Sequence, residues 1–278
     1  TFYSHEKSDS GLIAREHSFY VEAERVYFAF NNRMVLDDAH DKKAFELDDN
    51  IALEPVRTDQ TEMAVRSVGI SDDPKRSIHQ VGQGENCTTF MVMGDAVIGF
   101  GMSEGLGERL ETYRNQKKIN LPLRYVIASD HHDEDIGGAA DATQAGATLL
   151  VTVHTAAKLR ETQSNHDLDV VDEPRTIGDL TILPLATDHA ASILTAYHKT
   201  QKIVMQTGHY YSSFIEGPSY ARQTAVTFYE ALPSAIRAEA QAIISGQDMK
   251  LEKWSDFVSA VDKHEPVWCH RNRPICGP

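Results

Sequence analysis

Short apolar runs, separated by turns that contain glycine, alternate with longer helical stretches from residue 77 onward. Runs that are rich in β-branched and aromatic residues and are bounded by turn residues predict strands. On this basis we predict strands at residues 78–81, 88–93, 96–100, 124–128, 148–153, 180–185, 193–197, 202–205 and 242–244, and helices at residues 104–116, 137–145, 155–162, 220–230 and 251–261. Such a mixture of β-meanders and βα units predicts a layered α/β sandwich.

The first part of the chain has a different pattern. Residues 17–21 and 25–30 alternate apolar and polar side chains, as a half-buried hairpin does, whereas residues 37–72 are rich in charge and have no clear period. We interpret residues 1–76 as a β-rich N-terminal extension, which could be the end of an upstream domain. Residues 77–263 then form the main domain and residues 264–278 a C-terminal tail.

Composition narrows the classes of partner. The chain has 27 basic and 41 acidic residues and a formal net charge of -14, which repels phosphate backbones, so we expect no nucleic-acid partner. No apolar run is long enough to span a bilayer, and the 41% of hydrophobic residues is ordinary for a globular protein. We therefore expect a soluble, acidic protein that binds a small-molecule substrate or ligand. Its compartment and oligomeric state stay open.

A run of ionisable residues follows the predicted strand at residues 124–128. The sequence reads Ser129-Asp130-His131-His132-Asp133-Glu134-Asp135-Ile136-Gly137-Gly138, with six consecutive ionisable groups and two glycines that open a predicted helix. Loops at the carboxyl ends of strands are where α/β sheets bind ligands. Neighbouring charges resist burial unless cations or hydrogen bonds compensate them, so a bound metal is one explanation. The other is a solvated acidic loop whose carboxylates are stabilised by a helix N-terminus.

This segment resembles the metallo-β-lactamase superfamily, whose hallmark is Thr-His-x-His-x-Asp-His-x-Gly-Gly. Aligning the two glycines places Ser129 at the threonine, Asp130 at the first histidine, His132 at the second, Glu134 at the aspartate and Asp135 at the third histidine. Three later landmarks follow in the family's order: His189 at the next ligand histidine, His209 at the bridging aspartate and Gln247 at the last histidine. The resemblance implies an αββα sandwich in which the usual ligand positions are altered.

The resemblance also implies which residues could hold a metal. The first site would consist of Asp130, His132 and His189, a set of two imidazoles and one carboxylate that suits zinc, iron(II) or manganese. The second would consist of Glu134, Asp135 and Gln247, with His209 between the two sites. Because an amide is a weak ligand and a neutral imidazole cannot bridge two metals as a carboxylate does, we do not expect a two-zinc centre. The alternative is a salt-bridged network without a metal.

Two functions remain open at this stage. The first is a divergent hydrolase that acts on an ester, a phosphoester or a related substrate with one divalent metal, in which Glu134, Asp135 or His209 serves as a base or orients a ligand. The second is a catalytically inactive member of the superfamily that uses the pocket to bind a ligand or a protein partner.

Overall fold

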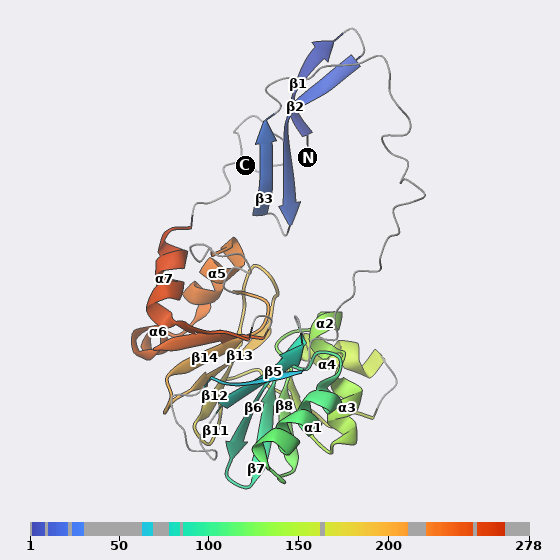
Figure 1. Cartoon of the computed structure of the whole chain (residues 1–278), viewed down its shortest axis with the longest axis vertical. Helices are drawn as coiled ribbons and strands as arrows, with labels where there is room; N and C mark the ends of the chain where they lie inside the picture. Colours follow the sequence, from blue (N-terminus) through green and yellow to red (C-terminus); the bar gives the residue numbers. More distant parts are fainter. Residues whose placement is uncertain are drawn as a thin grey trace. The chain divides into compact units, whose positions relative to one another are not determined.

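The computed structural model describes residues 2–8, 11–21, 24–30, 63–68, 78–83, 86–161, 165–210, 221–246 and 249–264. The chain divides into two compact units, Thr1–Gln60 with Glu265–Pro278, and Thr61–His264. In the first unit, strands β1 (Phe2–Ser8), β2 (Gly11–Val21) and β3 (Glu24–Phe30) form an antiparallel sheet in chain order (Figure 1). The hairpin predicted at residues 17–21 and 25–30 is confirmed as the pairing of β2 with β3.

The described residues of the second unit hold two sheets. The first has seven strands in the order β10-β9-β8-β7-β6-β5-β4, and its neighbours are antiparallel from β4 to β7 and parallel from β7 to β10. Its strands are β4 (Ala64–Ser67), β5 (Ile78–Gln83), β6 (Asn86–Met93), β7 (Ala96–Phe100), β8 (Leu123–Ile127), β9 (Thr148–Val151) and β10 (Leu168–Val170).

The second sheet of this unit has six strands in the order β11-β12-β13-β14-β15-β16. Its strands are β11 (Arg175–Ile177), β12 (Leu180–Leu185), β13 (Ile193–His198), β14 (Ile203–Gln206), β15 (Ala242–Ser245) and β16 (Leu251–Lys253). The pairing of β14 with β15 is parallel, and the other pairings are antiparallel.

Helices cover the outer face of each sheet (Figure 1). They are α1 (Leu106–Lys117), α2 (Asp133–Ile136), α3 (Ala139–Gln144), α4 (Val153–Glu161), α5 (Gln223–Ala231), α6 (Ser234–Glu239) and α7 (Trp254–Asp262). Apolar residues of α1, α3 and α4 pack against the seven-stranded sheet, those of α5, α6 and α7 pack against the six-stranded sheet, and a third cluster fills the space between the sheets. The layers are therefore helix, sheet, sheet and helix, as expected.

The structure differs from the predicted elements mainly where elements are short. The helix predicted from residue 251 begins at Trp254, because residues 251–253 instead pair with β15 as the edge strand β16. The strand predicted to residue 153 ends at Val151, because the side chain of Thr152 accepts a hydrogen bond from the backbone N–H of Thr155 and caps α4. Strand β4 lies in the segment interpreted as the N-terminal extension, yet it pairs with β5 in the main sheet.

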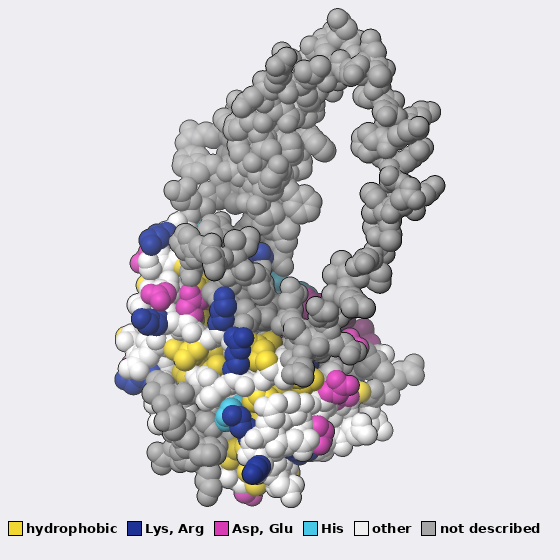
Figure 2. Space-filling model, viewed as in Figure 1, with side chains coloured by type: hydrophobic (Ala, Val, Ile, Leu, Met, Phe, Trp, Pro, Cys, Tyr) yellow, Lys and Arg dark blue, Asp and Glu magenta, His cyan; other side chains and the backbone are white. Residues whose placement is uncertain are grey.

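Charged side chains of both signs lie on one face of this unit (Figure 2). Figure 2 shows Lys and Arg interspersed with Asp and Glu on the visible face, with hydrophobic side chains exposed between them. Among the described helices, none is long and apolar enough to cross a bilayer.

Candidate metal centre

The ionisable residues singled out in the sequence gather where strands of both sheets end. Ser129 and Asp130 follow β8 of the seven-stranded sheet, and His132 immediately precedes the short helix α2. His189 lies in the turn after β12, and His209 follows β14, both in the six-stranded sheet. The fold thereby brings together residues that are up to 80 positions apart in the sequence.

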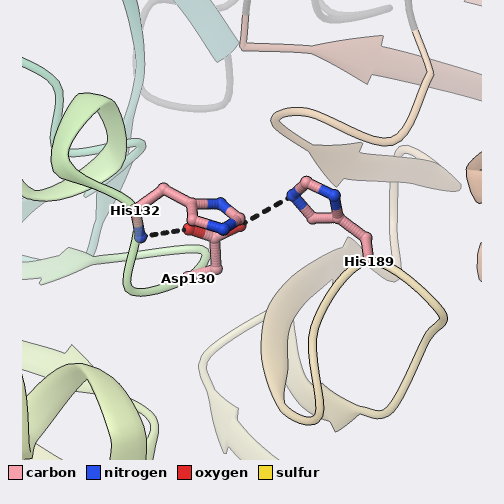
Figure 3. A group of neighbouring side chains, drawn as sticks. All are labelled: Asp130, His132 and His189. Carbon is pink, nitrogen blue, oxygen red and sulfur yellow. Dashed lines mark hydrogen bonds and ion pairs between the residues drawn. The ribbon is translucent and has the colours of Figure 1, made fainter. Parts of the chain in front are cut away.

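Asp130, His132 and His189 form a compact group (Figure 3). Their candidate ligand atoms all lie within 4.8 Å of one another. The Nδ1 atom of His132 lies 3.1 Å from Oδ2 of Asp130, and the Nε2 atom of His189 lies 3.5 Å from the same oxygen. The side chain of Asp130 is 1% exposed, those of His189 and His132 13% and 33%. Two imidazole nitrogens and one buried carboxylate therefore converge on one point, which solvent reaches from the histidine side.

The surroundings of Asp130 favour its ionised form. Burial opposes ionisation, but the hydrogen bond with His189, the backbone N–H of His132 and the nearby imidazole of His132 outweigh it, so the pKa of Asp130 lies well below its usual value. The backbone N–H of His132 donates to Oδ1 of Asp130 at 2.8 Å, which fixes the carboxylate plane. An ionised and oriented carboxylate is the form that binds a metal.

Asp135 lies next to Asp130 and is held by hydroxyl groups. The hydroxyl of Ser129 donates to Oδ1 of Asp135 at 3.1 Å, and Ser129 Oγ lies 2.5 Å from the hydroxyl oxygen of Thr207. Burial and the negative charge of Asp130 raise the pKa of Asp135 to about 7. Neither Ser129 nor Thr207 was predicted as a site residue, because a hydroxyl residue beside a strand end is too common to stand out in a sequence.

His209 is buried next to His189. Their rings are perpendicular with centroids 5.1 Å apart, and the Nε2 atom of His209 lies 3.2 Å from the hydroxyl oxygen of Thr187. Burial and the neighbouring His189 lower the pKa of His209 to about 4. His209 therefore supports one side of the group, and among the described residues it does not join either set of candidate ligands.

The residues expected at the second site are only partly brought together. The carboxylates of Glu134 and Asp135 and a ring nitrogen of His132 lie within 4.8 Å of one another, and Glu134 is exposed. This second set shares His132 with the first set, so the two do not form independent sites. Gln247, expected as its remaining ligand, lies outside the described residues.

A buried arginine supports the loop that carries the group. The guanidinium of Arg109 donates to the carbonyl oxygen of Glu104 at 2.7 Å, to the carbonyl and hydroxyl oxygens of Ser103 at 2.7 and 2.9 Å, and to the hydroxyl of Thr88 at 3.0 Å. The Ser103–Glu104 segment in turn contacts Gly138, whose N–H donates to the carbonyl oxygen of Met102 at 2.8 Å. Sequence reasoning missed Arg109, because one arginine in a helix rich in charged residues normally faces solvent.

Comparison with known proteins identifies the fold. No protein-family model and no curated protein sequence matches the chain. Among solved structures, DIM-1 metallo-β-lactamase aligns with a TM-score of 0.54 at 15% identity, over 72% of this chain and 97% of that chain. The FIM-1 metallo-β-lactamase from Pseudomonas aeruginosa, in its mono-zinc form, aligns with a TM-score of 0.53 at 17% identity, over 71% and 93%. A metallo-β-lactamase from Pontibacter korlensis aligns with a TM-score of 0.54 at 15% identity, over 73% and 100%.

The chain therefore has the metallo-β-lactamase fold, which confirms the expected αββα sandwich. Within this fold it carries a group of one aspartate and two histidines that is suited to a metal ion. The donor set fits a divalent metal, since two imidazoles and an ionised carboxylate are competent for zinc, iron(II) or manganese.

Proposed function

We propose that the chain is a metal-dependent hydrolase that holds a single divalent ion with Asp130, His132 and His189. The observation that carries this proposal is the convergence of these three side chains, within 4.8 Å, around a carboxylate that is 1% exposed. A buried ionised carboxylate is costly unless cationic or hydrogen-bonding groups surround it. The mono-zinc form of FIM-1 is a precedent for one metal in this fold.

The residues of the site divide into ligands and groups that orient them. Asp130 would supply the charged oxygen ligand, and His132 and His189 the neutral nitrogen ligands. The Ser129 hydroxyl, which contacts Asp135, would hold that carboxyl group beside Asp130, and His209 would hold the ring of His189. Lewis acidity towards a carbonyl or phosphoryl oxygen would come from the divalent ion held there.

Glu134 is the candidate general base. It is the exposed carboxylate that lies within 4.8 Å of both His132 and Asp135, so it can exchange a proton with solvent beside the ligands. Asp135 and His209 are more enclosed and already hydrogen-bonded, which suits an orienting role. Substrates of the proposed class are esters, phosphoesters and related compounds.

The test begins with the metal content of protein purified without added metal, measured by elemental analysis. We expect about one equivalent. Adding zinc, manganese or iron(II) to the metal-free protein at about 100 times the dissociation constant should raise the melting temperature by about 5–10 °C. Hydrolysis of generic ester and phosphoester substrates should depend on the same ion.

Matched variants locate the site. Asp130→Asn and His189→Ala should lose the metal that copurifies with the wild type and most of the thermal shift. Asp133→Asn is the control, because the Asp133 side chain is 89% exposed and pairs with Lys158 at 2.7 Å outside the group. No bound metal in the wild type, together with no thermal shift on adding the three ions, would overturn the proposal.

A further inference from the structure

Five imidazoles form a continuous row from the surface of α4 to the buried end of β14. Neighbouring ring centroids lie 6.4 Å apart from His154 to His131, 4.8 Å from His131 to His132, 4.7 Å from His132 to His189 and 5.1 Å from His189 to His209. His154 is exposed, His131, His132 and His189 are half-buried, and His209 is 3% exposed. The row thus leads from solvent into the proposed metal centre.

The outer two histidines of this row have no role in the proposed function. His154 lies in the first turn of α4, and its side chain is exposed. The Nδ1 atom of His131 is buried and has no hydrogen-bond partner within the described part of the chain. A buried ring nitrogen without a partner is stabilised by a ligand that binds it.

His131 and His154 are close enough to share a metal ion after a side-chain movement. Metal–nitrogen bonds of about 2.0–2.1 Å place the ring centroids of two imidazoles on one tetrahedral or octahedral ion about 4.5–5.5 Å apart. The observed centroids lie 6.4 Å apart, which is about 1 Å more. Because His154 is exposed, a small rotation of its side chain can adjust the geometry without disturbing a packed core.

The charged groups near His131 and His154 are compatible with a bound cation. Lys158 lies one turn further along α4 and would repel a metal ion, but its ammonium group pairs with the carboxylate of Asp133 at 2.7 Å. Glu134 adds an exposed negative charge beside His132. Acidic groups around an opening raise the local concentration of cations.

We propose that His131 and His154 form an outer metal-binding pair that takes up a divalent transition-metal ion from solvent and passes it to Asp130, His132 and His189. The delivery step rests on the proposed function, whereas the pair itself does not. Two neutral ligands without a carboxylate should bind the ion more weakly than the inner group does.

Equilibrium dialysis of the metal-free full chain against zinc tests the pair directly. We expect two classes of bound zinc in the wild type, the weaker by about tenfold or more. His154→Ala should lose the weak class and keep the tight one. Asp130→Asn should lose the tight class and keep the weak one. His166→Ala is the control, since His166 is a half-buried histidine outside the row whose Nδ1 contacts the hydroxyl of Thr143 at 2.7 Å.

Uptake kinetics test the delivery step. With limiting Co²⁺, the absorbance of the ion bound in the tight class should rise at least about fivefold more slowly in His154→Ala than in the wild type. In His166→Ala it should rise as fast as in the wild type. His131→Asn should behave like His154→Ala. A merely structural role of His154 would not slow uptake while leaving the tight class occupied at equilibrium.

The outcomes separate this inference from the proposed function. Tight zinc without a weak class in the wild type, or a weak class that survives in His154→Ala, overturns the outer pair. Equal uptake rates in the wild type and His154→Ala overturn delivery. A weak class without a tight one supports the pair but overturns the proposed function, and with it the delivery step.

Discussion

The hydroxyl oxygens of Ser129 and Thr207 lie 2.5 Å apart, although the two residues are separated by 78 positions and follow strands of different sheets. A second bond reinforces this contact, because the backbone N–H of Leu194 in β13 donates to the carbonyl oxygen of Ser129 at 2.6 Å. The two halves of the sandwich are thus joined directly beside the proposed ligands. The same Ser129 hydroxyl contacts Asp135, so the joint also orients a carboxyl group of the site.

A double-mutant cycle measures the interaction between the hydroxyl groups of Ser129 and Thr207. Ser129→Ala and Thr207→Val should each lower the free energy of unfolding by about 1–2 kcal/mol, because each leaves a buried polar partner unsatisfied. The double variant should be about 1 kcal/mol more stable than the sum of the two effects predicts, since the second change removes an already unpaired group. Urea denaturation measures all four proteins. Simple additivity would show that the hydroxyls do not interact.

Gly138 permits the close approach of the loop before α3 to the Ser103–Glu104 segment. An added Cβ would lie 2.4 Å from the carbonyl oxygen of Ser103 and 2.8 Å from Cβ of Leu106. We therefore expect Gly138→Ala to cost about 2 kcal/mol or more, because the backbone must shift to relieve the overlap. Metal binding should weaken with it, since the short helix α2 links the displaced residue to Asp130 and His132. Denaturation and zinc titration check the two effects.

Gly146→Ala is the matched control for this variant. Gly146 has a φ of +80°, but an added Cβ would meet nothing within 4 Å. The cost should be about 1 kcal/mol from the left-handed conformation alone, and zinc affinity should not change. If the two variants have the same effect on zinc binding, the contact of Gly138 does not position the ligands.

The sequence predicted the sandwich because its strands are apolar runs with clear turn residues between them. It did not predict β4, β10 and β11, which have only three or four residues and are half-buried or exposed at sheet edges. Part of the site, the run of ionisable residues around Asp130 and His132, was predicted because its members are neighbours in the sequence. The contacts of Ser129 with Thr207 and of Arg109 with Ser103 join distant residues of common types, so only the folded chain displays them.

We expect that no other cationic residue can replace Arg109 without a loss of stability. Its guanidinium makes four hydrogen bonds in a buried position, and burial lowers its pKa to about 10. Lysine keeps the charge but has no planar fork, so Arg109→Lys should cost about 2–4 kcal/mol of unfolding free energy. Arg124→Lys, in an exposed pair with Asp95 at 2.9 Å, should cost less than about 1 kcal/mol. Similar costs for the two variants would argue against a structural role for the Arg109 network.

His79 should make the protein sensitive to acid. It is 3% exposed, its ring lies 5.5 Å from that of Tyr113, and burial together with the charge of Lys117 lowers its pKa from 6.5 to about 4. Above pH 6.5 both the folded and the unfolded chain hold His79 neutral, so its contribution does not depend on pH. Between pH 6.5 and 4 His79 binds a proton in the unfolded chain but not in the folded chain, so the free energy of unfolding falls as the pH falls.

The variant His79→Leu isolates this effect from the other groups that titrate in the same range. From pH 7 to pH 4 the wild type should lose about 2–3 kcal/mol more unfolding free energy than His79→Leu does, a difference that follows from the depressed pKa. Tyr113→Phe keeps the ring beside His79, and burial raises the pKa of Tyr113 to about 12, so this control should lose as much as the wild type. Denaturant titrations at the two pH values measure the difference. An equal loss in the wild type and His79→Leu would show that His79 does not stay neutral in the folded chain.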